Sequence, residues 1–154
     1  MLGEGNNRSR ALGLARGVAR LLGAMGYGSL PEFVLGCGRR ADVFGMTGRG
    51  ALIIVEIKTS LADFRADQKW PEYESYCDQF YFAVPAEFPM AELPADRGLM
   101  AADAYGAAIL REAPPLVLAP ARRRALVLDF GFQASCRLGR LNDPNPPDLS
   151  LSGA

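Results

Sequence analysis

Asp42, Glu56 and Lys58 are the residues of this chain whose types and spacing could do chemistry. The segment 53–57 predicts a strand buried on both faces, because four of its five residues are large aliphatics. Glu56 and Lys58 lie two positions apart, so both side chains project from the same face of that strand. Charges are seldom placed there unless they pair, bind a metal ion or act on a substrate.

Asp42 precedes Glu56 by one predicted β-hairpin. With a three-residue turn at 48–50, facing residues have sequence numbers with an even sum, and Asp42 lies directly opposite Glu56. A two-residue turn would place the two carboxylates on opposite faces. The glycines on either side of Arg49 favour the three-residue turn, which needs a left-handed residue at its end. The pattern therefore predicts that Asp42, Glu56 and Lys58 share one face.

Two ionised carboxylates opposite each other repel, and Lys58 cancels only part of their charge. A bound Mg²⁺ or Mn²⁺ resolves this conflict, since hard cations take oxygen ligands and keep waters for substrate phosphates. The backbone carbonyl of Ile57 is a further candidate ligand. Lys58 would orient or help deprotonate a water, or stabilise charge on the reacting phosphate. Without Asp42, the Glu56 and Lys58 pair alone would indicate only a structural ion pair.

The composition indicates one globular domain. The chain has 154 residues, 49% hydrophobic and 22% charged, with a net charge of zero. The absence of histidine excludes most zinc sites and every histidine-based triad. No apolar run approaches the length of a membrane span, and no signal-peptide pattern opens the sequence, so we expect a cytoplasmic protein without a membrane partner.

The order of predicted elements indicates an α/β fold, with a mixed sheet flanked by helices. Ser9 and Ser60 are expected to cap helices, and we expect a flexible N-terminus at 1–8, a single domain at 9–140 and a disordered tail at 141–154. The expected helices are 9–25, 60–69, 71–76 and 122–138, and the expected strands are 30–35, 40–46, 51–58, 79–84, 98–102 and 107–111.

Asp42 followed by Glu56-x-Lys58 at the end of an apolar strand resembles the signature of the restriction-endonuclease-like, or PD-(D/E)XK, nuclease superfamily. The order helix-strand-strand-strand-helix-strand is similar to its α-β-β-β-α-β core. A longer likeness, over roughly residues 10 to 135, is to the MmcB-type DNA repair proteins of bacteria. It is carried by Glu32-Phe33, Gly38-Arg39-Arg40-Ala41-Asp42-Val43, Glu56-Ile57-Lys58, Asp63-Phe64-Arg65, Lys69-Trp70-Pro71, Tyr81-Phe82-Ala83-Val84-Pro85 and Ala108-Ile109-Leu110-Arg111-Glu112-Ala113.

The resemblance implies that Asp42 and Glu56 bind a divalent metal ion and that Lys58 assists phosphodiester hydrolysis. Many superfamily members add a glutamate on the first helix. Residues 9–25 contain no acid, and Glu32 is the nearest substitute, with an exposed strand residue as the alternative interpretation.

Five residues are candidates for DNA contact. Two are arginines, whose guanidinium groups suit phosphate oxygens. Two are a Gln and a Tyr of the kind that some superfamily members carry on the following helix. The last is a lysine beside Trp70, which could meet the DNA backbone. Trp70 itself is expected to pack in the core. The candidates are Arg39, Arg40, Gln68, Tyr73 and Lys69.

These observations predict a Mg²⁺- or Mn²⁺-dependent DNA endonuclease acting in DNA repair, with DNA and other repair proteins as partners. The first alternative is a non-catalytic module on the same fold that binds DNA or a repair partner, which the neutral charge and the missing helix glutamate favour. The second is an unrelated α/β protein whose Glu-x-Lys is structural. Superfamily members often act as homodimers, although no feature of this sequence indicates one.

Overall fold

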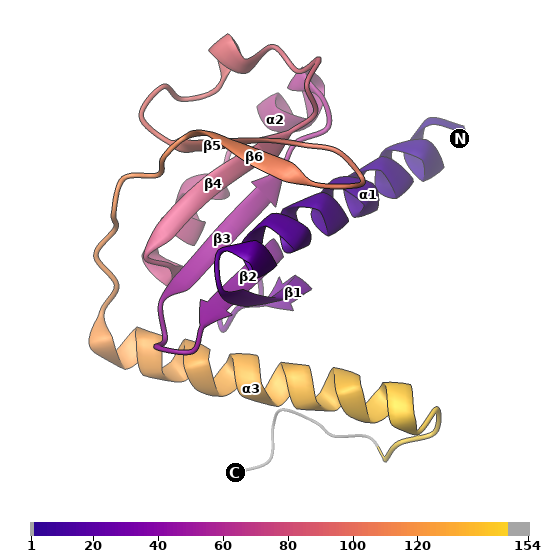
Figure 1. The fold of residues 1–154 in the computed structure, drawn as a ribbon, viewed down its shortest axis with the longest axis vertical. Helices are drawn as coiled ribbons and strands as arrows, with labels where there is room; N and C mark the ends of the chain where they lie inside the picture. The colour runs from indigo at the N-terminus through magenta and orange to yellow at the C-terminus, as the bar shows by residue number, and fades with distance from the viewer. Residues whose placement is uncertain (1, 148–154) are drawn as a thin grey trace.

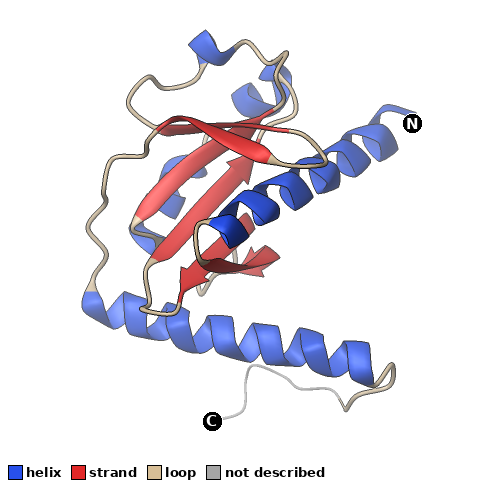
Figure 2. Ribbon diagram, in the orientation of Figure 1, coloured by secondary structure: helices blue, strands red, loops and turns tan. Residues whose placement is uncertain are grey.

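The computed structural model, which describes residues 2–147, is built on one six-stranded sheet with the strands in chain order (Figures 1 and 2). Strands β3, β4 and β5 are parallel, and the other neighbours are antiparallel. The strands are β1 Tyr27–Val34, β2 Arg40–Thr47, β3 Leu52–Ile57, β4 Gln79–Val84, β5 Gly98–Ala102 and β6 Ala107–Arg111. The helices are α1 Leu2–Ala24, α2 Leu61–Ala66 and α3 Pro120–Asn142, with short 3₁₀ turns η1 Trp70–Tyr76 and η2 Met90–Glu92.

Two hydrophobic cores lie on the two faces of the sheet. On one face, α1 crosses the strands and buries an apolar stripe against them (Figure 1), with Leu14, Val18 and Leu22 all buried. On the other face, η1 and α3 cover a second core that is rich in aromatic rings. Trp70 stacks on Phe80 there, with ring centroids 5.7 Å apart, which confirms its structural role. The mixed α/β fold predicted from the sequence is therefore confirmed.

The turn between β2 and β3 has the predicted three residues. The Thr47 amide donates to the Ala51 carbonyl at 3.0 Å, and Gly50 adopts the left-handed φ of 85° that closes such a turn. Val43 consequently faces Val55, and the same constant sum places Asp42 opposite Glu56.

The first helix is longer than the sequence predicted. It begins at Leu2, so Ser9 lies inside the helix and most of the expected flexible segment 1–8 is helical. Gly3, Gly5 and two asparagines are poor helix formers and concealed this extension. The side chain of Asn7 contacts the hydroxyl of Thr59, and this tertiary contact holds the first turns in place.

Other boundaries differ by fewer residues. The first strand begins at Tyr27, and the second helix ends at Ala66 rather than near 69, although Ser60 caps it as predicted and accepts the Asp63 amide at 3.1 Å. The last helix extends to Asn142, into the expected tail 141–154, and residues 148–154 of that tail lie outside the described residues. No helix within the described part of the chain is long and apolar enough to cross a membrane.

Helix α1 approaches the β5–β6 hairpin so closely that only glycine fits at position 17. A Cβ there would overlap the carbonyl oxygens of Asp103 and Gly106. We expect Gly17→Ala to lower the free energy of unfolding by about 1–3 kcal/mol, the usual cost of overpacking, despite the better helix propensity of alanine. Chemical denaturation measures the change.

Gly23→Ala is the matched control, because nothing lies within 4 Å of its added Cβ in the same helix. It should be neutral or stabilising by up to about 1 kcal/mol. Equal stabilities for the two variants would contradict the packing described for α1.

Candidate active site

Asp42 and Glu56 meet where strands β2 and β3 separate. The ladder between the two strands ends at the pair Val43 and Val55. Beyond that pair, the backbone N–H groups of the two strands donate to side-chain carboxylates instead of to backbone carbonyls. The Asp42 amide donates to Oε1 of Glu56 at 3.0 Å, and the Ile57 amide donates to Oδ2 of Asp42 at 2.8 Å. Each carboxylate is therefore anchored by a backbone N–H of the opposite strand.

Among residues 2–147, no donor is recorded for the second oxygen of either carboxyl group, Oδ1 of Asp42 or Oε2 of Glu56, and neither oxygen is among the buried polar atoms that lack a partner, so water can reach both. The two groups are close enough for a hydrogen bond between them when one is protonated. Glu56 is 4% exposed. Glu56 is thus more deeply buried than Asp42, which is half-buried.

Burial is the largest influence on the pKa of both acids. It raises the pKa of Asp42, and it raises the pKa of Glu56 well above its ordinary value. The charge of Asp42 raises the pKa of Glu56 further, whereas the anchoring backbone N–H groups and the Lys58 ammonium lower both. The pair therefore resists carrying two negative charges without a compensating cation.

Lys58 extends this cluster, although the acid it pairs with directly is Asp67. Its ammonium lies 2.7 Å from Oδ2 of Asp67, and its side chain is 6% exposed. Burial alone would lower the pKa of Lys58, but the hydrogen bond to Asp67 and the charges of Asp67, Glu56 and Asp63 outweigh it and raise the pKa. Lys58 therefore remains protonated at neutral pH.

The turn after Lys58 is fixed by helix α2. Oδ2 of Asp63 accepts the Thr59 amide at 3.1 Å, next to the Ser60 cap. The Lys58 amide donates to the Ala83 carbonyl of β4 at 3.0 Å. The backbone that carries the lysine is therefore held both by the capped helix and by the neighbouring strand.

Tyr73 lies beside the carboxylates but is buried, with 7% exposed. Its hydroxyl donates to the Arg40 carbonyl at 2.9 Å. Burial first, and then the charges of Glu56 and Asp42, raise the pKa of Tyr73. The structure thus corrects the predicted DNA contact of this residue, because the hydroxyl already holds the start of β2.

The other residues predicted to contact DNA differ in their exposure and in whether their charge is paired. Arg40, Gln68 and Lys69 are exposed. Arg39 is half-buried and forms an ion pair with Glu72, which raises the pKa of its guanidinium, so its charge is partly compensated. Arg40 is the most available cation next to Asp42 in sequence.

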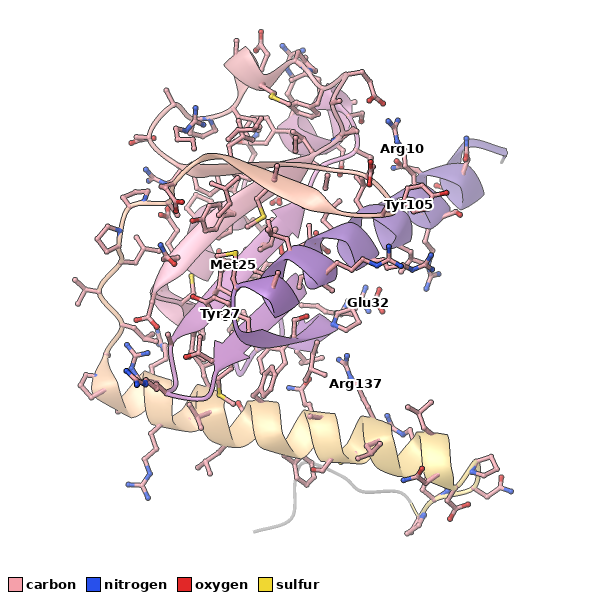
Figure 3. The ribbon with its side chains drawn as sticks, in the orientation of Figure 1. Arg10, Met25, Tyr27, Glu32, Tyr105 and Arg137 are labelled. Carbon is pink, nitrogen blue, oxygen red and sulfur yellow. The ribbon has the colours of Figure 1, made fainter. Side chains whose placement is uncertain are left out.

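Glu32 faces Asp42 by the register of β1 and β2 but is turned out of the ladder by its φ of 49°. Its carboxylate is exposed and lies 3.9 Å from the Arg40 guanidinium, and Arg137 of α3 donates to its carbonyl at 2.9 Å (Figure 3). It is not among the main influences on the pKa of Asp42 or of Glu56. The structure does not bring Glu32 into the site.

Sequence reasoning missed Asp67 and Asn7. Asp67 has no local signal, because its link to Lys58 depends on where α2 ends. Asn7 lies in the expected flexible segment 1–8, and the helix that carries it also contains Glu4, an acid outside the expected range 9–25. Both residues act through contacts that only the folded chain defines.

The donor set fits a hard divalent cation that keeps much of its water. No cluster of three or more Asp, Glu, Cys or His side chains suited to a metal ion occurs among the described residues, so Asp42 and Glu56 would be its only carboxylate ligands. Mg²⁺ is commonly bound in this way, by one or two carboxylates with water and substrate phosphates. The Ile57 peptide adjoins the pair through its N–H, and ligation by its carbonyl stays a prediction.

Comparisons with known proteins agree with the sequence resemblance. The family model described as DNA repair protein MmcB-like matches residues 1–145. A solved structure of a protein of unknown function from Silicibacter pomeroyi is 46% identical, with a TM-score of 0.84 over 94% of this chain and 96% of that one. Comparison with curated proteins gives no significant match.

Removing one charge from the pair should stabilise the metal-free protein. We expect Glu56→Gln to raise the free energy of unfolding at pH 7–8 by about 1 kcal/mol, or roughly 2–4 °C in Tm, because the amide oxygen still accepts the Asp42 N–H while the repulsion is removed. Since folding raises both pKa values, the penalty is present above them and disappears as the pH falls through them.

The difference in Tm between Glu56→Gln and the wild type should therefore shrink as the pH is lowered from 8 towards the ordinary carboxyl range near ~4.5. Thermal unfolding in chelator at several pH values measures it. Glu32→Gln, at an exposed carboxylate, is the control and should show no such trend. A Glu56→Gln variant less stable than the wild type at pH 8 would contradict the described repulsion.

Proposed function

Because the chain belongs to the MmcB-like DNA repair protein family, we propose that it is a divalent-metal-dependent DNA endonuclease with a restriction-endonuclease-like active site. The observation that carries the proposal is the pair Asp42 and Glu56 at the end of the β2–β3 ladder, the first half-buried and the second buried, each held by one backbone N–H of the opposite strand and with one oxygen left for a further ligand. Two adjacent acids, one of them buried, are costly in a purely structural role, because a buried charge without a partner costs several kcal/mol.

Asp42 and Glu56 would hold Mg²⁺ or Mn²⁺, with the Ile57 carbonyl as a further ligand. The bound ion would supply charge neutralisation at the phosphate and a more acidic water. The backbone N–H groups of Asp42 and Ile57 fix the orientation of both carboxylates before any ion arrives. The protein thus meets the cost of assembling the ligands during folding rather than during binding.

Lys58 would act as a fixed positive charge rather than as a base. Its raised pKa keeps it protonated, and Asp67 fixes the ammonium at 2.7 Å. A buried ammonium beside the scissile phosphate stabilises negative charge that develops during phosphodiester cleavage. Of the mechanisms that the sequence left open for this lysine, the electrostatic one fits its surroundings best.

The exposed side chains of Arg40, Gln68 and Lys69 are the proposed contacts to the DNA backbone near the site. Each lies on a segment next to a site residue in sequence, Arg40 before Asp42 and the other two after Asp67. Other repair proteins and a second copy of the chain stay predicted partners, and the proposed chemistry uses residues of one chain.

Nicking of supercoiled plasmid in Mg²⁺ or Mn²⁺ tests the activity. We expect the wild type to nick, chelator to abolish the reaction, and Asp42→Asn or Glu56→Gln to reduce the rate by at least ~100-fold, the usual cost of losing a metal ligand or a key electrostatic group. Lys58→Met should reduce the rate by a similar factor.

Asp143→Asn is the matched control. It is exposed after the end of α3, the amide oxygen can still accept the Asn145 N–H, and nicking should be unchanged. Activity that survives in Asp42→Asn would rule out the assigned site. A wild-type protein that binds DNA but cuts no DNA structure in either metal would support the non-catalytic DNA-binding module instead.

A further inference from the structure

Helix α3 turns one apolar side away from the rest of the protein. Its inner side lies towards the sheet (Figure 1), where Gln133 exchanges two hydrogen bonds with the backbone of Val34. The other side carries a row of residues spaced alternately four and three positions apart, the repeat of helices that pack along one another. The row consists of Ala121, Ala125, Leu128, Phe132, Ser135 and Gly139, all exposed, and Arg124, Gly131 and Leu138 flank it on one edge. We call this surface the outward face.

Three large apolar side chains of the outward face are left in solvent. Leu128 is 66% exposed, Phe132 is 39% exposed and Leu138 is 59% exposed. Single exposed apolar residues are ordinary on a protein surface, but these three lie on one side of one helix within about three turns. A continuous apolar surface of this kind usually marks a place where another molecule binds.

Glycines lie between these large residues, although nothing in the described part of the chain requires glycine there. An added Cβ at Gly131 or Gly139 would meet no atom within 4 Å, and neither residue has a positive φ. Glycine forms helices worse than every other residue except proline, so both residues weaken α3. The missing side chain does, however, let the backbone of a second molecule approach closely. The two glycines therefore fit a close contact between α3 and another helix.

The order of large and small residues along the outward face fits a second copy of the same helix that runs in the opposite direction. With a two-fold axis between residues 133 and 134, each large side chain meets a small residue of the second copy, and the symmetry repeats every contact. The facing pairs are Leu128 with Gly139, Phe132 with Ser135, and Leu138 with Gly131. A parallel pair would instead place large side chains against each other and leave a gap between the glycines.

The charge of the outward face also favours the antiparallel direction. Arg124 is the one charged residue among those that form this face. In the antiparallel pair, the two copies of Arg124 lie about 28 Å apart along the helix axes, far beyond the ~8 Å over which charges interact at physiological salt. A parallel pair would place them side by side, where they repel. A face with so little charge suits an apolar helix rather than nucleic acid, which needs several cations.

We propose that α3 packs antiparallel against α3 of a second copy of the chain and forms a homodimer through the outward face. The helix has 23 residues and is about 34 Å long, so a second copy can cover the whole face. The match of large residues to small residues of the same face is what selects a second copy over a different protein. The interface uses no residue of the carboxylate site, and the inference goes beyond the proposed function.

Sedimentation equilibrium with the full chain at about 1–100 μM, a range that spans modest to weak self-association, tests the dimer. We expect the wild type to dimerise and Leu128→Glu to raise the dissociation constant by at least about 10-fold, because the interface would bury the new charge. Leu141→Glu is the matched control. Leu141 is also an exposed leucine of α3, at 84%, but it lies outside the outward face, so the dissociation constant should not change.

Gly139→Leu separates the interface from the fold of the single chain. The new side chain has free space within the chain and a better helix propensity, so Tm should not fall. It would occupy the place of Leu128 from the second copy, and we expect the dissociation constant to rise by at least about 10-fold. The double variant Leu128→Ala with Gly139→Leu should return to within about 3-fold of the wild type, because it exchanges the large and the small residue of one facing pair. In a parallel pair, Gly139→Leu alone would add a contact between two leucines and strengthen the dimer.

Two results would overturn the inference. The first is a dimer that is insensitive to Leu128→Glu and Gly139→Leu. The second is a wild type that stays monomeric at about 100 μM. In that second case, a lower Tm of Leu128→Glu would assign the outward face to another segment of the same chain, and an unchanged Tm would leave it to a different protein.

Discussion

The register of the β2–β3 hairpin is the constraint on which the rest of the structure depends. A turn of three residues places Asp42 opposite Glu56, and each carboxylate accepts a backbone N–H from the other strand. Rotating either side chain away would relieve the repulsion but leave a buried N–H without a partner, at a cost of about 1–3 kcal/mol. The backbone thus holds together two charges that would otherwise separate.

The surrounding elements stabilise this arrangement from three directions. Helix α2, capped by Ser60, fixes the turn after Lys58, and Asp67 at its end holds the ammonium. Tyr73 of η1 ties down the start of β2. The first turns of α1 reach Thr59 through Asn7. A functional site of this kind usually lowers the stability of the ligand-free protein, because groups arranged to bind a ligand lack favourable partners when the ligand is absent.

Local patterns predicted the parts of this structure that depend on local physics. The glycines around Arg49 predicted the turn, its register and the shared face of Asp42 and Glu56, and the Ser60 cap followed from its spacing to Asp63. Partners distant in sequence were not predictable. The expected first helix was too short because Asn7 is held by a tertiary contact, and Glu32 is turned away by a local backbone conformation that no side-chain pattern reveals.

The most direct test of the central claim is the anomalous scattering of Mn²⁺ in crystals of the protein. We expect one peak within bonding distance of Asp42 and Glu56, at about 2.0–2.6 Å from their oxygens, and no peak there in crystals of Asp42→Asn. Crystals soaked in Mn²⁺ that show no density between these carboxylates, or show the ion bound only elsewhere, would contradict it.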